Sequence, residues 1–240
     1  MTVLNVAVSW APYPEGSPRA AQQRQAFTRL AEIAPSWCSV TLTVQAREKA
    51  PVVPVPAGGL QVVVLPRDAS SVAGGRRLPF FRDMLDVAVA GLPPDGWGGI
   101  LNSDIVVTQE FFDLFERLNR DMRVVICHRT DVRHLDTDPG QGQKVNQRTC
   151  TDGVFVRPDM WAKHRLELPD YILGEPLWDT GFIFWTKLRK LPTFHMGNHE
   201  LLHVRHGRFW SYRSPGSQYN SNLGKKLWKF GTKGDGSHER

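Results

Sequence analysis

The sequence has little cysteine and no long apolar run, and both absences limit what the chain can be. Its three cysteines, Cys38, Cys127 and Cys150, are unevenly spaced among 240 residues. They predict neither a disulfide framework nor a zinc cluster, so we expect a reducing, cytoplasmic environment. No apolar run approaches the roughly 20 residues of a membrane span. Residues 1–11 lack a basic region and a cleavage-site pattern, so we expect no signal peptide.

Two common phosphate-binding signatures are also missing. No G-x-G-x-x-G follows the first predicted strand, and no G-x-x-x-x-G-K-[ST] occurs anywhere. The chain is therefore neither a typical dinucleotide-binding protein nor a P-loop protein. There is no internal repeat. A hydrophobic content of 41% is enough for a sizeable core, and the length is normal for one α/β domain.

The net charge of +6 is concentrated at the end of the chain. Residues 1–204 are balanced, while residues 205–240 carry the whole basic excess and interleave it with Trp210, Tyr212, Tyr219, Trp228 and Phe230. This pattern suits contact with a polyanion such as nucleic acid, and it also suits an anionic membrane surface. A third interpretation is a segment packed by its aromatic side chains and followed by a disordered basic end.

Apolar runs and helical periodicity alternate along the chain. They predict strands at 3–10, 40–44, 60–65, 100–101, 105–107, 123–127 and 151–156, and helices at 19–34, 78–92, 109–119 and 180–188. Strands that alternate with helices indicate an α/β fold with a mainly parallel sheet and right-handed crossovers. Residues 60–65 are almost entirely apolar, which predicts a strand covered on both faces. Residues 134–147 predict a mobile loop.

The central stretch is residues 99–107, in which Asn102, Ser103 and Asp104 interrupt two apolar runs. They follow a predicted buried strand, and open α/β sheets bind ligands at the carboxyl ends of their strands. In extended geometry Asn102 and Asp104 point the same way, which suits Mg²⁺ or Mn²⁺ holding a diphosphate. The alternative is an Asn/Asp turn without a ligand.

Arginines follow the third predicted strand. Arg67 and Asp68 could contact a nucleotide, or they could form an ion pair at the strand end. Arg76, Arg77 and Arg82 could neutralise a diphosphate, because arginine binds phosphate through two hydrogen bonds; the alternative is a solvated face.

Two carboxylates flank a tryptophan near residue 178. Glu175 and Asp179 lie on either side of Trp178, and a carboxylate beside an aromatic wall can act as a general base toward a sugar hydroxyl. Asp179 can equally serve only as the N-cap of the helix predicted at 180–188.

His199, Glu200 and His203 match the H-E-x-x-H pattern of zinc hydrolases. His206 follows too soon to be the third ligand at metzincin spacing, so we expect no protease site. One of these histidines could instead complete a metal site begun by Asp104. The remaining histidines are expected at the surface.

Taken together, these motifs resemble the nucleotide-diphospho-sugar transferases of the GT-A fold, in particular those related to glycosyltransferase family 2. The residues that carry the resemblance are Leu78–Asp83 with Ile100–Ile105, Asp152–Val156 with Leu173–Asp179, and His195–His203. The resemblance implies a GT-A-like (Rossmann-like) three-layer sandwich. It implies that Asp104 and Asn102 hold a metal, that Asp68 contacts the base, and that Asp179 deprotonates the acceptor. Asn102 replaces the first acid of the D-x-D motif.

The sequence thus predicts a glycosyltransferase domain at 1–210 and a basic aromatic tail at 211–240. The expected site residues are Asp179 and Glu175 for catalysis; Ser9, Arg67, Asp68, Arg82, Asn102 and Asp104 for the donor; Asp152 and Trp178 for the acceptor; and Asp104, Asn102 and His203 for Mn²⁺ or Mg²⁺. The expected acceptor is a hydroxyl-bearing glycan, lipid-linked or nucleic-acid substrate. The alternatives are a non-catalytic nucleotide- or nucleic-acid-binding protein on this fold, and a zinc hydrolase.

Overall fold

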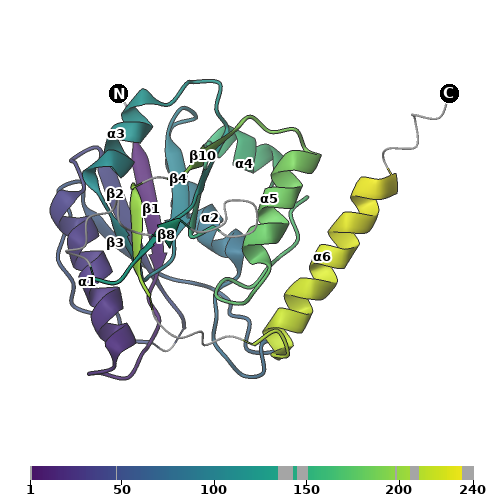
Figure 1. Cartoon of the computed structure of the whole chain (residues 1–240), viewed down its shortest axis with the longest axis horizontal. Helices are drawn as coiled ribbons and strands as arrows, with labels where there is room; N and C mark the ends of the chain where they lie inside the picture. The colour runs from purple at the N-terminus through teal and green to yellow at the C-terminus, as the bar shows by residue number, and fades with distance from the viewer. Residues whose placement is uncertain are drawn as a thin grey trace.

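A seven-stranded sheet with helices on both faces forms the body of the molecule (Figure 1). The computed structural model describes residues 2–46, 48–134, 143–144, 151–197, 199–205 and 211–233; for 143–144 and 229–233 it describes the backbone alone. The predicted three-layer α/β architecture is confirmed.

The large sheet is parallel except for one strand. Its order is β10-β6-β9-β4-β1-β2-β3. The strands are β1 (Leu4–Ser9), β2 (Cys38–Val44), β3 (Leu60–Val64), β4 (Trp97–Leu101), β6 (Val124–Cys127), β9 (Gly153–Val156) and β10 (Thr193–Met196). Only β9 runs antiparallel, to β4 on one side and to β6 on the other. The amino end of β9 therefore lies at the end of the sheet where β4 and β6 have their carboxyl ends.

Two cores cover the two faces of this sheet. One contains α1 (Pro18–Ile33) and α3 (Gln109–Arg117), which pack on residues such as Val6 and Val8. The other contains α2 (Phe81–Val89), α4 (Pro158–His164) and α5 (Trp178–Leu188), which pack on residues such as Ala7 and Ile100. Successive residues of β1 thus enter opposite cores, as the period of a strand requires.

The expectation that residues 60–65 are covered on both faces is wrong. β3 pairs with β2 alone and forms an edge of the sheet. The Val62 and Val64 side chains are accordingly 44% and 59% exposed. A continuous apolar run does not distinguish a central strand from an edge strand, because position in the sheet depends on the rest of the chain.

A second sheet of four strands lies against the large one, and sequence patterns did not predict it as a unit. Its order is β5 (Ile105–Val107), β11 (Leu201–Val204), β7 (Thr130–Val132) and β8 (Gln143–Lys144). β11 pairs antiparallel with β5 and parallel with β7. Most of the loop predicted at 134–147 lies outside the described residues, as do Cys150, His206 and Trp210.

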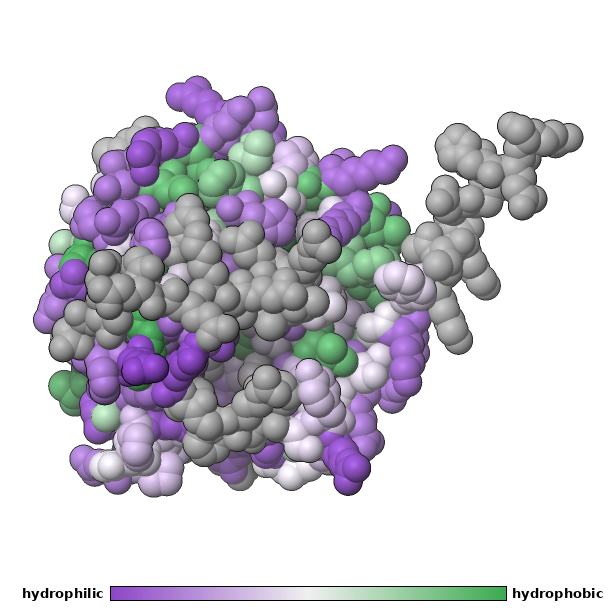
Figure 2. Space-filling model, in the orientation of Figure 1, coloured by the Kyte–Doolittle hydropathy of each residue, from purple (hydrophilic) through white to green (hydrophobic). Residues whose placement is uncertain are grey.

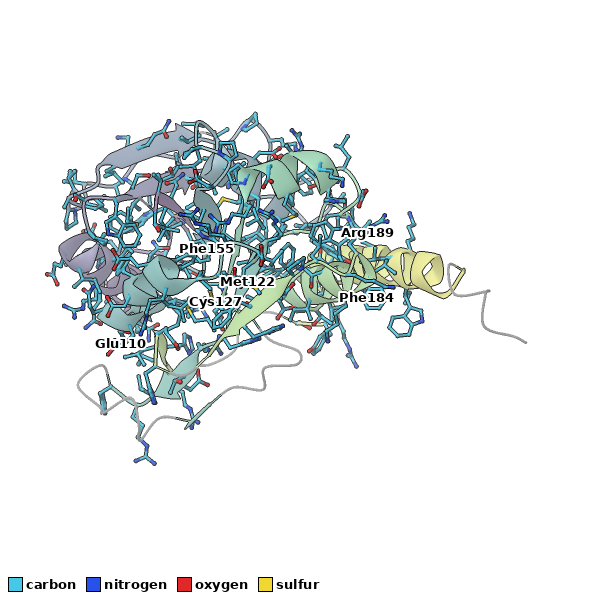
Figure 3. The ribbon with its side chains drawn as sticks, turned by 90° about the horizontal axis from the view of Figure 1, so that it is seen from above. Glu110, Met122, Cys127, Phe155, Phe184 and Arg189 are labelled. Carbon is cyan, nitrogen blue, oxygen red and sulfur yellow. The ribbon has the colours of Figure 1, made fainter. Side chains whose placement is uncertain are left out.

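The carboxyl-terminal helix α6 (Pro215–Lys233) packs along α5 and then extends beyond the body (Figures 1 and 3). Trp228 stacks on Phe184 with ring centroids 4.9 Å apart, and Leu227 is buried in the core beside α5. Lys225 and Lys226 are exposed. Figure 2 shows a hydrophobic area where α6 meets the body. The interpretation of this segment as packed by its aromatic side chains therefore holds for Trp228.

None of the helices in the described ranges is both long enough and apolar enough to span a membrane.

Glu175 fastens the start of α6 to the body. Its buried carboxylate accepts hydrogen bonds from Ser214 (2.8 Å) and Ser217 (2.9 Å), and it pairs with Arg76 at 2.5 Å. Asn220 adds to this junction by accepting a hydrogen bond from the Ile172 amide. The structure thus gives Glu175 a structural task in place of the predicted catalytic one, because all three partners belong to the α6 junction.

Gly98 allows α2 to lie against the backbone of β4. A Cβ atom at this position would lie 2.4 Å from the carbonyl oxygen of Ala88. Gly98→Ala should therefore lower the free energy of unfolding by about 1–3 kcal/mol, measured by urea denaturation. Gly224→Ala is the matched control, because its nearest neighbour is 3.9 Å away within a helix. It should raise stability by about 1 kcal/mol. Equal effects of the two substitutions would contradict this packing.

Glu175→Gln should destabilise the α6 junction. It removes the charge that pairs with Arg76 and weakens two hydrogen bonds at a buried position, at a cost of about 1–3 kcal/mol. Thermal denaturation measures the loss, and limited proteolysis should show earlier cleavage near residues 211–214. Arg77→Gln is the control, because Arg77 lies in the same loop as Arg76 and is also exposed. It should leave the melting temperature and the rate of proteolysis unchanged. If Glu175→Gln keeps its melting temperature and loses only turnover, the predicted catalytic role is restored.

Candidate active site

The candidate site lies where the order of the sheet reverses. The chain proceeds outward from β1 to β2 and β3, and then returns to β4 on the other side of β1. Such a switch point is where open α/β sheets bind ligands, outside the carboxyl ends of the strands. The last pair in register is Val8 with Leu101, so Ser9 lies next to Asn102. The prediction that Asn102 to Asp104 follow the carboxyl end of a buried strand is thus confirmed.

Asn102, Ser103 and Asp104 form a tight turn between β4 and β5. The Ile105 amide donates to the carbonyl oxygen of Asn102 at 3.2 Å. The argument that Asn102 and Asp104 share one side of an extended strand is therefore wrong, because the chain turns between them. Both side chains nevertheless approach Asp152: Asn102 Nδ2 donates to its Oδ1 at 3.0 Å, and the charge of Asp104 helps to raise its pKa.

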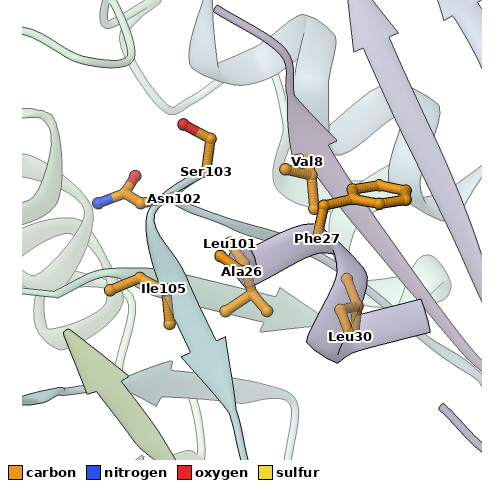
Figure 4. Close-up of a pocket in the computed structure, with 8 residues that line it drawn as sticks. All are labelled: Val8, Ala26, Phe27, Leu30, Leu101, Asn102, Ser103 and Ile105. Atoms are coloured by element: carbon orange, nitrogen blue, oxygen red, sulfur yellow. The ribbon is translucent and has the colours of Figure 1, made fainter. Parts of the chain in front are cut away.

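A small cavity lies beneath this turn (Figure 4). Val8, Phe27 and Leu30 line its apolar side, and its volume is about 10 Å³. Ligand pockets for small molecules usually measure at least about 300 Å³, so this cavity is far too small to hold a nucleotide.

The second sheet brings His203 to the turn. In register, His203 lies opposite Ile105 of β5 and beside Asp131 of β7. Its Nε2 is 3.5 Å from Asp104 Oδ2, and its Nδ1 is 2.9 Å from Asp131 Oδ1. Burial lowers the pKa of His203, but the hydrogen bonds with Asp104 and Asp131 outweigh it and raise that pKa to about 9. The structure thus joins three expected metal ligands: Asn102, Asp104 and His203.

This arrangement excludes the zinc-hydrolase alternative. In a zinc hydrolase the two histidines of H-E-x-x-H share one face of a helix. Here Glu200 lies in a bend and the segment continues into strand β11. His199 and Glu200 lie in the bend and His203 lies in β11, so the helix face that would place the two histidines on one ion is not formed.

Asp152 connects three strands at this edge. It immediately precedes β9, is buried, and accepts hydrogen bonds from Asn102 and from Arg129 Nη1 at 2.6 Å. Burial raises the pKa of Asp152, and Arg129 opposes that rise. The predicted contact of Asp152 with an acceptor stays a prediction; the observed contacts hold the site together.

Asp179 reaches the same cluster from α5. The residue before the helix is Leu177, in a left-handed conformation with φ of 77°, so the prediction of Asp179 as the N-cap is wrong. Asp179 lies in the first turn and its Oδ1 accepts a hydrogen bond from the Thr180 amide at 2.7 Å. Burial, aided by the charge of Asp152, raises the pKa of Asp179 to about 6, although hydrogen bonds from Thr180 and Thr151 oppose the rise.

Trp178 is buried, whereas a ring that binds an acceptor would be exposed to solvent. Its side chain is 5% exposed, and its ring packs 5.2 Å from that of Phe81. The expectation that this ring binds the acceptor is therefore wrong for the chain as it is folded here, because the ring belongs to the core beneath α5.

Arg67 and Arg82, both predicted to contact the donor, have partners within the protein. Arg67 pairs with Asp83 at 2.8 Å and Asp170 at 2.6 Å, and Arg82 donates to the carbonyl oxygen of Leu168 at 2.6 Å. Asp68 accepts a hydrogen bond from the Ser70 amide, which forms a local turn. The structure thus places these side chains in loop and helix contacts, because α2 brings Asp83 next to the end of β3.

Sequence reasoning missed Arg129 and Asp131. Arg129 Nε donates to Asp131 Oδ1 at 2.8 Å while its Nη1 binds Asp152. Arg129 is the second residue after β6 and Asp131 lies in the short strand β7 that comes next, and polar residues at a strand's carboxyl end were the signal used for Asn102. Applying that signal to every strand would have found them.

The donor set suits a hard divalent cation in part. Among the described residues, no three His, Cys, Asp or Glu side chains are grouped closely enough to hold a metal ion by themselves. Asp104 and His203 are close, Asn102 adds an amide, and Asp104 remains 30% exposed. Mg²⁺ and related ions commonly use one or two protein ligands and complete their shell with water and phosphate oxygens. The residues present therefore fit a cation that binds together with a diphosphate.

Comparisons with known proteins support this fold. No protein-family model and no curated protein matches the chain. The mannosyltransferase PcManGT from Pyrobaculum calidifontis, solved with GDP-Man and Mn²⁺, is similar with a TM-score of 0.52 and 9% identity, over 85% of this chain and 57% of that one. S. aureus TarS 1-349 has a TM-score of 0.49 and 11% identity, over 95% and 65%.

The glycosyltransferase GlyE of Streptococcus pneumoniae TIGR4 has a TM-score of 0.45 and 11% identity, over 96% of this chain and 64% of that one. This chain thus spans about three-fifths of the length of the structures it matches. The fold assignment rests on PcManGT, and identity this low shows the fold alone. The chain has a GT-A-like glycosyltransferase fold.

Proposed function

We propose that the chain transfers a sugar from a nucleoside diphosphate donor to a hydroxyl group of an acceptor. The observation that carries this proposal is one cluster at the switch point. Asp104 is close to His203, Asn102 donates a hydrogen bond to Asp152, and the charge of Asp152 acts on Asp179. The proposed cation and diphosphate site would therefore adjoin a carboxylate that can accept a proton.

The donor side is built for a diphosphate held by Mn²⁺ or Mg²⁺. Asp104, Asn102 and His203 would hold the cation, which when bound neutralises charge on the departing diphosphate. PcManGT was solved with GDP-Man and Mn²⁺, and this supports the same donor class here. Ser9 follows Val8, whose partner Leu101 precedes Asn102, and in this proposal it contacts the donor.

The acceptor side depends on Asp179. Its pKa of about 6 leaves it ionised at neutral pH yet more basic than an ordinary aspartate. In the proposed step Asp179 takes the proton of the acceptor hydroxyl. The hydroxyl oxygen bonds to the anomeric carbon, the bond from that carbon to the diphosphate oxygen breaks, and the nucleoside diphosphate leaves with the electron pair.

The alternative of a non-catalytic nucleotide-binding protein on the same fold predicts binding without turnover. Release of free nucleoside diphosphate in the presence of an acceptor separates the two. Contact of the basic tail with a polyanion also stays a prediction; Arg213, Lys225 and Lys226 are exposed basic residues of the described part of the tail that would make it.

Asp104→Ala should abolish Mn²⁺-dependent binding of a nucleotide sugar. A panel of nucleotide sugars with and without Mn²⁺, read as shifts in melting temperature, measures this, because a ligand that binds only the folded state stabilises it. Asp121→Ala, an exposed residue with the same change in charge, should bind as the unmodified chain does. Metal-dependent shifts that persist in Asp104→Ala would refute the assignment of the donor site.

Asp179→Asn should lower turnover by roughly 10²–10⁴-fold and leave donor binding intact. It should also stabilise the protein. Because folding raises the pKa of Asp179 from 3.8 to about 6, ionising it costs stability, and that cost is complete above pH 6 and absent below about pH 4. The variant should therefore gain about 1–3 kcal/mol at pH 7 and nothing at pH 4.

Urea denaturation at both pH values and a turnover assay test the same variant. Turnover of the unmodified chain should fall as the pH drops below about 6, when Asp179 becomes protonated. A variant that loses stability and keeps turnover would show that Asp179 serves only the first turn of α5.

A further inference from the structure

We propose that Asp131 is a positioning residue that holds His203 in place and thereby sets the affinity of the site for a divalent cation. The inference rests on the proposed function, because it assigns a cation to Asp104 and His203. It adds Asp131, a residue that no sequence motif singled out. It also specifies that Asp131 acts through His203.

The geometry of His203 leads to this inference. One ring nitrogen, Nδ1, is 2.9 Å from Asp131 Oδ1, and the opposite one, Nε2, is 3.5 Å from Asp104 Oδ2. The Asp131 carboxylate accepts a hydrogen bond from Nδ1–H and leaves Nε2 as the ring nitrogen that a cation could reach. Asp131 therefore orients the ring so that Nε2 faces the carboxylate of Asp104.

The backbone makes this contact rigid. His203 and Asp131 are in-register neighbours on the parallel strands β11 and β7, and the His203 side chain is buried. The imidazole cannot turn away without losing its hydrogen bond in a buried position, which is costly. Such a ring is already oriented before any cation binds.

Arg129 in turn holds Asp131. It donates to Asp131 Oδ1 at 2.8 Å and to Asp152 Oδ1 at 2.6 Å, so it links the two carboxylates. Asp152 accepts from Asn102 as well. A continuous set of hydrogen bonds therefore runs from Asn102 through Asp152, Arg129 and Asp131 to His203.

A simpler role for Asp131 is to neutralise nearby arginines. Arg205 Nε lies 3.8 Å from its Oδ2, in addition to the contact with Arg129. This role predicts that removing Asp131 lowers stability and leaves cation affinity unchanged. The experiment therefore measures cation affinity directly and does not depend on turnover.

The test is the dissociation constant for Mn²⁺ alone, measured by electron paramagnetic resonance on the full chain. Asp131→Ala and His203→Ala should each weaken Mn²⁺ binding by about 10–100-fold. The double variant should be no weaker than His203→Ala, because Asp131 acts through that ring. Asp121→Ala controls for the loss of one negative charge and should bind Mn²⁺ normally.

Unchanged affinity in Asp131→Ala, or losses that multiply in the double variant, would overturn the inference. If Asp131→Ala does not fold, Asp131→Asn replaces it, with the same comparison in the His203→Ala background. Asp104→Ala separates the two proposals. If it abolishes Mn²⁺ binding while Asp131→Ala does not, only this inference fails; if it leaves Mn²⁺ binding intact, the proposed cation site fails too.

Discussion

Strand β9 runs against its neighbours, and the site depends on that one reversal. In a parallel sheet every strand brings its carboxyl end to the functional edge. Because β9 is antiparallel to β4 and β6, it brings its amino end there instead. Asp152, just before β9, is thereby buried between Asn102 and Arg129. The reversed strand thus supplies the carboxylate that connects the proposed donor side with the proposed acceptor side.

The candidate site brings several carboxylates close together, and these carboxylates have different partners. Asp104 and Asp131 lie on either side of His203, and Arg129 binds both Asp131 and Asp152. No comparable cation contacts Asp179 among the described interactions, and burial raises its pKa. Carboxylates in one site whose pKa values diverge are suited to different tasks, one set holding charge and the other exchanging a proton.

The composition of helix α6 does not by itself predict where the helix packs. Its basic residues suggested a working surface, yet part of the helix packs on α5 through Leu227 and Trp228. Glu175 and Asn220 fasten its start to the body. Arg76, predicted to bind diphosphate, is engaged at this same junction. The tail is therefore part of the architecture that supports α5, which carries Asp179.

By itself the sequence determined the α/β class, most of the strands and helices, and the end of a buried strand before Asn102, because apolar periodicity acts locally. It also singled out Asp179 and His203. Only the tertiary structure decided that β3 is an edge strand, that Glu175 and Arg67 serve ion pairs, and that Asp131 and Arg129 belong to the site. These outcomes depend on which segments meet in space. Burial, ion pairing and pKa shifts arise from these tertiary contacts. Sequence patterns are local and do not predict contacts between residues far apart in the chain.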